Sequence, residues 1–429
     1  MMNFGMSGFQ PPQPMQPAAE ITAKPSGISV SIAEAAMSLE RICRTYLERD
    51  KEGGFVIPVN RQRPIMLMGP AGIGKTDIPR QTAEKMGIGY VSYSITHHTR
   101  QSALGLPKIT EKDYNGEMTL TTEYTASEIV SSVYEMIKTS GRRDGILFID
   151  EVNCASETLS APLLQLFQNK TLGQSRIPDG WILVMAGNPP EYNKSVKEFD
   201  AVTRDRLRII NITPDADAWL VYADRQCLNS AVVSFINSDK SKIYGFDSAA
   251  GQIVTPRGWE ELSISIDSYA RHGFEITTEL ISQFIGIPAV ASEFYDYYKM
   301  VCEYITEKDI DAIISGKASD KFIKSMTSCG YNIRYMLISC LKRRLHKFSS
   351  EDRDSANLAM NNIVAFLERA YSSGSETDLF MSGILSDPEI VTMTVTCHNE
   401  HFGKYLNEIT GDEKAIKSEI KKSRRKAVN

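Results

Sequence analysis

The sequence contains no long run of hydrophobic residues. No segment reaches the roughly 18 consecutive apolar residues that a membrane-spanning helix requires, and the N-terminus lacks the basic and then apolar pattern of a secretion signal. The seven cysteines are scattered and form no C-x-x-C pair, which predicts reduced thiols and neither a disulfide framework nor a zinc site. Together these absences predict a cytoplasmic protein with no membrane partner.

The sequence also lacks a strong excess of charge and is poor in histidine. Its 48 Lys and Arg against 53 Asp and Glu give a net charge of −5, and it contains no recognised DNA-binding motif, so the balance argues against nucleic acid as a partner. The pair His97-His98, among only six histidines, has no acids at metal-ligand spacing. We interpret this pair as loop or strand-end residues.

A glycine-rich loop stands out against this background. Residues 69–76 read Gly-Pro-Ala-Gly-Ile-Gly-Lys-Thr and follow the apolar run 65–68, which predicts a buried strand. The glycines allow backbone N–H groups to point inward as an anion nest, and a helix from Thr76 to about Met86 adds its N-terminal dipole. The context predicts a P-loop for ATP. The nucleotide-binding residues predicted are Gly69, Pro70, Ala71, Gly72, Ile73, Gly74, Lys75 and Thr76.

Two further apolar strands end in polar side chains. Residues 145–151 end in the adjacent acids Asp150 and Glu151, and strand ends of this kind meet ligands at the carboxyl edge of a parallel sheet. Asp150 would hold Mg²⁺ together with the Thr76 hydroxyl, and Glu151 would orient and deprotonate the attacking water. The strand 181–188 ends in Asn188, which would position the nucleophile; the same Asn also favours a turn before Pro189.

These motifs together resemble the AAA+ ATPases, and the flanking segments resemble their MoxR branch. Residues 69–76 are similar to the Walker A motif, 147–153 to Walker B, and 178–193 to the sensor-1 strand with its surroundings. Residues 199–207 are similar to the arginine-finger segment and 255–259 to sensor 2. The resemblance covers about residues 30 to 265.

The resemblance implies roles for four catalytic residues. Asn188 would be sensor 1, and Glu151 the catalytic base. Arg206 would be the arginine finger that enters a neighbouring subunit's nucleotide site, with Arg204 as the alternative. Arg257 would be sensor 2, acting in its own subunit or in the next one.

The predicted fold class is α/β: an AAA+ P-loop core with a parallel sheet, an all-helical lid domain, and a helical C-terminal extension. Residues 1–27 are rich in Pro, Gln and Met and carry almost no charge, which predicts a disordered tail. The core is placed at 28–213, the lid with sensor 2 at 214–335, and the extension at 336–429. From Lys414 the extension is basic, which is typical of a solvated helix end.

The connection between the predicted strand at 87–95 and the helix 126–139 is long for a compact α/β unit. Because the family carries an insertion here that points at the ring's central channel, we place such a client-facing element at 104–120. Residues 169–180 are a second candidate, where the family has a hairpin. The alternative for both segments is a passive surface loop.

The sequence leaves two main functions open. In the first, the chain forms a hexameric ring that binds ATP and Mg²⁺ and hydrolyses ATP. The ring would act as a chaperone or activator on a protein client, and the resemblance implies a VWA-domain adaptor as a partner. In the second, it is a nucleic-acid-coupled AAA+ motor of a mobile element or restriction system. A third and weaker hypothesis is a nucleotide-dependent binding module with little turnover, against which the acid pair and the candidate finger argue.

Overall fold

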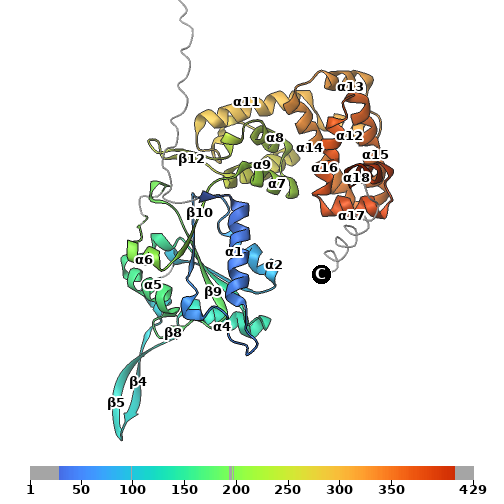
Figure 1. The fold of residues 1–429 in the computed structure, drawn as a ribbon. Helices are drawn as coiled ribbons and strands as arrows, with labels where there is room; N and C mark the ends of the chain where they lie inside the picture. The colour runs from blue at the N-terminus through green and yellow to red at the C-terminus, as the bar shows by residue number, and fades with distance from the viewer. Residues whose placement is uncertain (1–28, 98, 193–195, 197, 411–429) are drawn as a thin grey trace, which may run out of the picture.

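The computed structural model describes residues 29–97, 99–192, 196 and 198–410. The predicted tail 1–27 and the basic end from Lys414 therefore lie outside the described residues. Figure 1 shows three parts: an α/β core, a helical lid above it, and a helical bundle beside the lid. Within the described residues, no helix is both long enough and apolar enough to cross a membrane.

The core is built on one sheet of six strands. Their order is β1-β10-β2-β9-β6-β3, and every neighbouring pair is parallel. The strands are β1 (Ser29–Val30), β2 (Ile65–Met68), β3 (Gly89–Ser94), β6 (Gly145–Asp150), β9 (Trp181–Gly187) and β10 (Arg208–Ile212). The predicted parallel sheet and the strands for all three motifs are confirmed.

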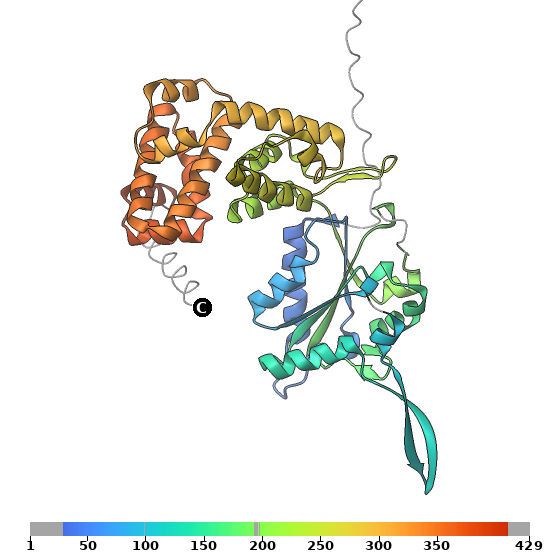
Figure 2. The same cartoon turned by 180° about the vertical axis from the view of Figure 1, so that it is seen from behind.

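Helices cover both faces of this sheet, which Figure 2 shows from behind. In β6 the side chains alternate, so that Ile146 and Phe148 pack with α1 and α2 on one face, while Leu147 and Ile149 pack with α4 and α5 on the other. Burial on both faces explains why the strands are continuously apolar. The core helices are α1 (Ile32–Leu47), α2 (Asp77–Met86), α3 (Arg100–Leu104), α4 (Glu128–Ser140), α5 (Glu157–Asn169) and α6 (Ala201–Asp205).

Local signals fix where these helices begin and end. Ser31 and Glu34 form a capping box at the start of α1, and Ser127 caps α4 as the sequence predicts. Gly87 ends α2 in the left-handed conformation, with φ 67°, which a glycine adopts without steric cost.

The long connection after β3 forms a two-stranded antiparallel hairpin, β4 (Pro107–Tyr114) and β5 (Glu117–Tyr124). It projects from the core on the side away from the lid (Figure 1). The predicted insertion at 104–120 contains β4 but stops within β5, because the second strand continues to Tyr124. The second candidate segment forms a much shorter hairpin, β7 (Thr171–Leu172) and β8 (Ser175–Arg176).

The lid is helical apart from one short antiparallel hairpin, β11–β12. Its buried cluster centres on Phe235, Trp259 and Phe294, whose rings contact one another. Pro256 occupies the first turn of α9, the helix that carries Arg257, as predicted. The lid elements are α7 (Ala216–Arg225), α8 (Ser230–Ser238), β11 (Gly245–Asp247), β12 (Gln252–Val254), α9 (Pro256–His272), α10 (Thr278–Ser282) and α11 (Pro288–Tyr304).

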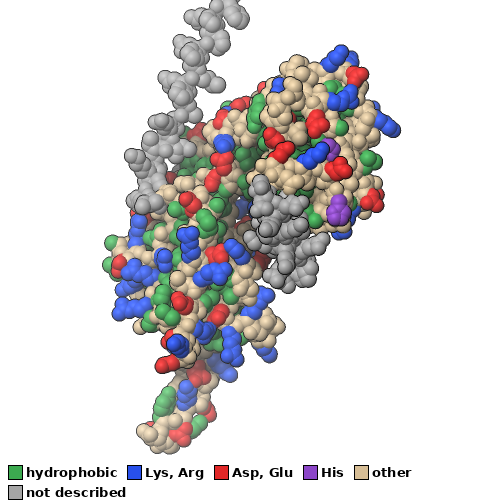
Figure 3. Space-filling model, turned by 45° about the vertical axis from the view of Figure 1, so that its right-hand side comes forward, with side chains coloured by type: hydrophobic (Ala, Val, Ile, Leu, Met, Phe, Trp, Pro, Cys, Tyr) green, Lys and Arg blue, Asp and Glu red, His purple; other side chains and the backbone are tan. Residues whose placement is uncertain are grey.

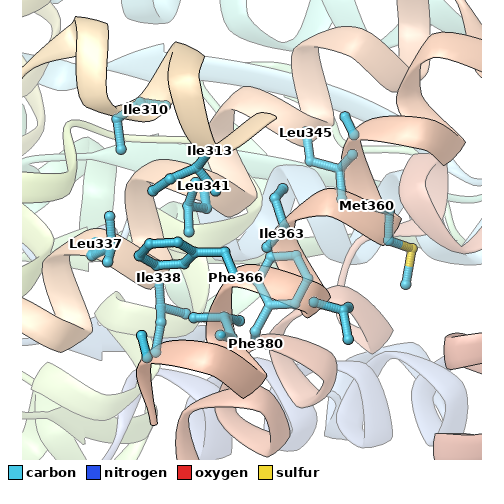
Figure 4. Packing of buried hydrophobic residues seen from close by; sticks show 14 of the residues in the cluster. Ile310, Ile313, Leu337, Ile338, Leu341, Leu345, Met360, Ile363, Phe366 and Phe380 are labelled. Atoms are coloured by element: carbon cyan, nitrogen blue, oxygen red, sulfur yellow. The ribbon is translucent and has the colours of Figure 1, made fainter. Parts of the chain in front are cut away.

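The C-terminal bundle has its own apolar cluster, part of which Figure 4 shows. Leu337 and Leu341 of α14 are fully buried in it, beside Ile363 and Phe380. The predicted boundary between residues 335 and 336 falls inside the continuous helix α14. Tyr335 packs against the lid cluster, while Leu337 and the buried residues after it pack in the bundle cluster. The bundle helices are α12 (Glu307–Ile314), α13 (Asp320–Thr327), α14 (Tyr331–Glu351), α15 (Arg353–Ala370), α16 (Ser375–Leu385), α17 (Pro388–Thr396) and α18 (Glu400–Thr410).

A substitution at Phe294 tests the packing of the buried cluster in the lid. Its ring centroid lies 5.2 Å from that of Phe235 and 5.3 Å from that of Trp259. We expect Phe294→Ala to lower the free energy of unfolding by about 3–5 kcal/mol, because it leaves a cavity among buried rings. The matched control is Phe274→Ala, in which the removed side chain is 59% exposed and the expected loss is below about 1 kcal/mol. Equal losses in urea denaturation would contradict this packing.

Candidate functional site

The order of the sheet brings three loops to one edge. β9 lies between β2 and β6, so that the P-loop after β2, Asn188 after β9 and the acids at the end of β6 are neighbours. A hydrogen bond from the Gly69 N–H to the Gly187 carbonyl, at 3.3 Å, continues the ladder beyond the strands. The predicted Walker A, Walker B and sensor-1 residues therefore meet at the carboxyl edge of the sheet.

The P-loop needs its glycines for backbone conformation and for space. Gly72 and Gly74 have φ of 73° and 92°, in the region that L side chains rarely adopt. A Cβ atom on Gly69 would lie 2.6 Å from the Ile212 carbonyl oxygen of β10. The loop leads into α2, for which Thr76 is the N-cap residue. The N-terminus of α2 thus faces the cradle, as anion binding requires.

Lys75 is buried at the centre of the site. Its Nζ donates hydrogen bonds to the carbonyl oxygens of Gly69 (2.8 Å) and Pro70 (2.5 Å) and to Asn188 Oδ1 (2.9 Å). The pKa of Lys75 is lowered to about 8. Burial is the main cause and the nearby Arg257 charge contributes, while Asp150 and Glu151 oppose the shift. A buried ammonium group that has neutral hydrogen-bond partners is well suited to receive an anion.

Thr76 and Asp150 lie together beside Lys75. The Thr76 hydroxyl donates a hydrogen bond of 2.7 Å to Asp150 Oδ2. Hydroxyl and carboxylate oxygens are ligands that Mg²⁺ accepts, and Mg²⁺ keeps several waters and phosphate oxygens as its other ligands. The donor set that the sequence predicts for Mg²⁺ therefore fits the ion.

Glu151 has an unusual backbone conformation. It is one of the non-glycine residues with positive φ, at 54°, and its N–H donates to Asp150 Oδ1 at 2.8 Å. Its carboxylate accepts hydrogen bonds from Thr96 Oγ1 (2.8 Å) and Ser94 Oγ (3.3 Å) at the end of β3. These hydroxyls hold the candidate base in a fixed position, and the sequence prediction missed both of them.

Asn153 is a second residue that sequence reasoning left without a role. It is buried, and its Nδ2 donates a hydrogen bond of 2.7 Å to the backbone carbonyl of Asn188. A Cβ atom on Gly187 would lie 2.5 Å from Asn153 Oδ1, so a glycine is required there. An amide two residues after Glu151 is the signal that could have identified it.

Arg257 reaches the site from the lid of its own chain. Its backbone N–H donates to the Gly72 carbonyl at 3.2 Å, and its guanidinium is near enough to lower the pKa of Lys75. The neighbouring Thr255 also contacts the P-loop, because a Cβ atom on Gly72 would lie 2.8 Å from Thr255 Cβ. Of the two alternatives left open for Arg257, this arrangement favours action in its own subunit.

Arg204 and Arg206 lie at the opposite edge of the sheet. Arg206 precedes β10, in which Arg208 pairs with Ile65 at the start of β2, whereas the P-loop follows the end of β2. The length of that strand alone separates the two edges by about 13 Å. Both arginines are exposed, so neither is placed to reach the P-loop of its own chain.

Arg206 lines an open depression of about 480 Å³. The buried Lys170 lies in its wall, and burial lowers the pKa of Lys170 to about 8. Asp205 is the carboxylate that lines it. The basic residues of the wall are Arg61, Arg63, Lys170, Arg176 and Arg206. Arg63 and Arg176 form ion pairs with Asp205 and Asp179. Basic residues nevertheless outnumber carboxylates in the wall, so the depression has a net positive lining.

Comparison with known families agrees with this geometry. Residues 64–207 match the model of the AAA domain, dynein-related subfamily. The chain contains an AAA+ ATPase domain. The match spans about a third of the 429 residues and includes the P-loop, both acids, Asn188 and Arg206. No curated protein matches the chain.

The AAA domain is a P-loop module that binds and hydrolyses nucleotide. The six-stranded parallel sheet and the mostly helical remainder of the described chain are the architecture expected of it. The assignment of the chain to the MoxR branch, in contrast, rests on the sequence resemblance.

The pKa of Lys75 predicts a pH dependence of nucleotide binding. Free Lys75 loses its proton as the pH rises through about 8. Bound phosphates favour the charged amine, so its pKa rises in the complex. Binding of a non-hydrolysable MgATP analogue should therefore take up a proton above about pH 8 and weaken by up to about tenfold for each pH unit.

Calorimetric titration in two buffers of different ionisation enthalpy measures this proton uptake. Near pH 7, where Lys75 is already charged, the uptake should be small. The Glu84→Gln variant, altered on the far side of α2, should behave like the parent. An affinity that stays constant up to about pH 9, with no proton uptake, would contradict a buried Lys75 at the nucleotide.

Proposed function

We propose that this protein is a ring-forming AAA+ ATPase of the MoxR type that hydrolyses MgATP to remodel a protein client. The observation that carries the proposal is the division of the predicted catalytic residues between two edges of one sheet. Lys75, Asp150, Glu151 and Asn188 lie at one edge, and Arg206 lies at the other. In this arrangement the nucleotide site of one chain lacks a finger of its own, and the Arg206 of a neighbouring copy would complete it.

Each residue at the nucleotide edge has a defined task in this proposal. The P-loop N–H groups and Lys75 bind the phosphates, and Arg257 senses the γ-phosphate from the lid of the same chain. Thr76 and Asp150 hold Mg²⁺, which would neutralise charge on the phosphates. Asn188 orients the attacking water, and Glu151, which the hydroxyls of Ser94 and Thr96 position, takes its proton.

The edge of the sheet that carries Arg206 explains why the protein would form a ring. An interface that joins one edge of a subunit to the opposite edge of the next is heterologous, and it closes by rotation. The cationic depression around Arg206 complements the anionic nucleotide of the neighbouring copy. A hexamer is the assembly that we propose, as in other AAA+ proteins.

Two inactive variants can test this arrangement together. Glu151→Gln should slow ATP hydrolysis at least about 100-fold, because a general base is lost, and Arg206→Ala should slow it to a similar degree or more. In a mixture of the two, about a quarter of the interfaces would pair an intact Glu151 with an intact Arg206. The mixture should therefore regain activity that neither variant has alone.

The same mixing experiment with Arg204→Ala decides between the two candidate fingers. If Arg206 is the finger, Arg204→Ala should hydrolyse ATP nearly as the parent does. Sedimentation of the Glu151→Gln variant with ATP should show the assembly. A strictly monomeric protein with full activity, or a mixture that stays inactive, would refute the ring.

We propose that the hairpin β4–β5 is the element that binds the protein client. Cross-strand partners share a face, and the register of this hairpin puts all of its apolar residues except Tyr114 on one face of the ribbon. Ile109, Met118 and Leu120 on that face are 64–72% exposed. The apolar residues of that face are Pro107, Ile109, Met118, Leu120 and Tyr124, and the polar residues Glu111, Asp113 and Thr122 lie on the same face.

The opposite face of the hairpin is polar apart from Tyr114. There Lys112 forms an ion pair with Glu123, and Thr110 lies across from Thr121. Figure 3 shows the hairpin projecting at the bottom of the molecule, with hydrophobic side chains on its surface. A ribbon of two strands buries little by itself, so its exposed apolar face suits an unfolded or extended polypeptide better than a nucleic acid, which would require cationic groups. A VWA-domain adaptor is a second partner for this surface.

Changes on the two hairpin faces should have different effects. We expect an unfolded model protein such as reduced, carboxymethylated lactalbumin to stimulate ATP hydrolysis several-fold. The double substitution Ile109→Ser/Leu120→Ser should remove the stimulation and leave basal hydrolysis unchanged, because the hairpin lies far from the nucleotide. The control Thr110→Ala/Thr119→Ala on the polar face should retain it.

Nucleic acid should not stimulate hydrolysis in the same assay. A several-fold stimulation by DNA that falls steeply with salt would favour the alternative, a nucleic-acid-coupled motor. Stimulation by the unfolded protein that is equal in both hairpin variants would overturn the role of the apolar face.

A further inference from the structure

Three side chains that can ligate a metal meet where the lid contacts the C-terminal bundle. Cys227 follows α7 in the lid, His346 lies on α14, and Asp387 directly precedes α17. One donor atom of each, a thiol sulfur, an imidazole nitrogen and a carboxylate oxygen, lies within 4.8 Å of the other two. The three residues are far apart in the sequence, which explains why spacing predicted no zinc site.

The backbone around this cluster fixes the position of its ligands. Asp387 is 4% exposed, and its Oδ1 accepts the N–H groups of Glu389 and Ile390 at the start of α17. Its Oδ2 accepts a hydrogen bond of 2.6 Å from His346 Nδ1. Cys227 is held at φ 51° where α7 ends, with its N–H donating to the Asp224 carbonyl.

Two cations of α14 near this cluster pair with carboxylates of the lid. Lys342 pairs with Asp224, and Arg343 pairs with Asp267. Each of these cations on α14 thus has a carboxylate of its own from the lid. The carboxylate of Asp387 and the ring of His346 remain as a pair that faces the thiol.

A nucleophilic thiol is the competing explanation for a cysteine, a histidine and an aspartate in proximity. In a cysteine–histidine pair that activates a nucleophile, one imidazole nitrogen takes the thiol proton. Here His346 Nδ1 donates to Asp387 Oδ2, and Nε2 lies 3.7 Å from Glu389 Oε2. Both ring nitrogens therefore face carboxylates, which favours a ligand set over a catalytic triad.

We propose that Cys227, His346 and Asp387 bind one zinc ion that joins the lid to the C-terminal bundle. Thiolate, imidazole and carboxylate are ligands that zinc accepts together, and water completes a tetrahedron. Mg²⁺ prefers oxygen ligands alone, so the site would not compete for the ion at the P-loop.

The protons can be accounted for at each ligand. Zinc displaces the thiol proton of Cys227 into solvent, and the His346 proton shifts from Nδ1 to Nε2. Glu389 Oε2 lies 3.7 Å from Nε2, on the side where a second carboxylate commonly orients a metal-bound histidine. Room for the ion requires the His346–Asp387 contact to open from 2.6 Å to about 3.4 Å, the edge of a zinc tetrahedron.

Zinc titration of the full chain tests this proposal. Chelator-treated protein in excess Mg²⁺ should bind one Zn²⁺ per chain, measured by equilibrium dialysis with elemental analysis. With Co²⁺ in place of zinc, a near-ultraviolet thiolate-to-cobalt absorption band should appear. Zinc should also raise the melting temperature, because it joins two parts of the fold.

Single substitutions locate the ion. Cys227→Ser and Asp387→Asn should weaken zinc binding at least about 100-fold, and Glu389→Gln about tenfold, as expected for an outer-shell residue. Cys302→Ser, which changes an exposed thiol outside the cluster, should bind zinc like the parent. Circular dichroism establishes that each variant is folded.

Three outcomes would overturn the site. The first is a parent protein that binds no zinc in excess Mg²⁺. The second is zinc binding that is equally strong in folded Cys227→Ser and in the parent. The third is a cobalt complex without the thiolate band.

Discussion

The position of β9 between β2 and β6 is the constraint on which the nucleotide site depends. Parallel strands end at the same edge, so this order brings Lys75 within 2.9 Å of Asn188, and Thr76 within 2.7 Å of Asp150. Burying an ammonium group is costly unless hydrogen bonds compensate it, and here the Gly69 and Pro70 carbonyls and Asn188 do so. The apolar strands that supply this edge are covered by helices on both faces, which makes it rigid.

The lid is connected to this edge through backbone contacts. The N–H of Arg257 donates to the Gly72 carbonyl, and Thr255 packs against the position where Gly72 lacks a Cβ atom. A change in the P-loop on nucleotide binding therefore acts directly on the start of α9. Because Trp259 of α9 is fully buried in the lid cluster, such a change would move the lid as a unit.

The lid in turn is joined to the C-terminal bundle by α14. This helix packs against α8 of the lid and against α15, α16 and α17 of the bundle. Lys342 and Arg343 on it form ion pairs with Asp224 and Asp267 of the lid, and His346 on the same helix pairs with Asp387 of the bundle. One helix thus carries contacts to both parts, which provides a path from the P-loop through the lid to the far end of the molecule.

Local signals in the sequence are sufficient to predict most of the core elements and the residue types that gather at the candidate nucleotide site. Apolar runs that end in Gly69, Asp150 and Asn188 define strands and their polar ends, and Ser127 and Pro256 mark helix starts, because these signals act within a few residues. Which side chains meet across elements depends on how those elements pack in three dimensions. Ser94 and Thr96 hold Glu151, Arg206 lies opposite its own P-loop, and Cys227 meets His346 and Asp387. These contacts follow from strand order and helix packing, to which residues distant in the sequence contribute together, so no local pattern encodes them.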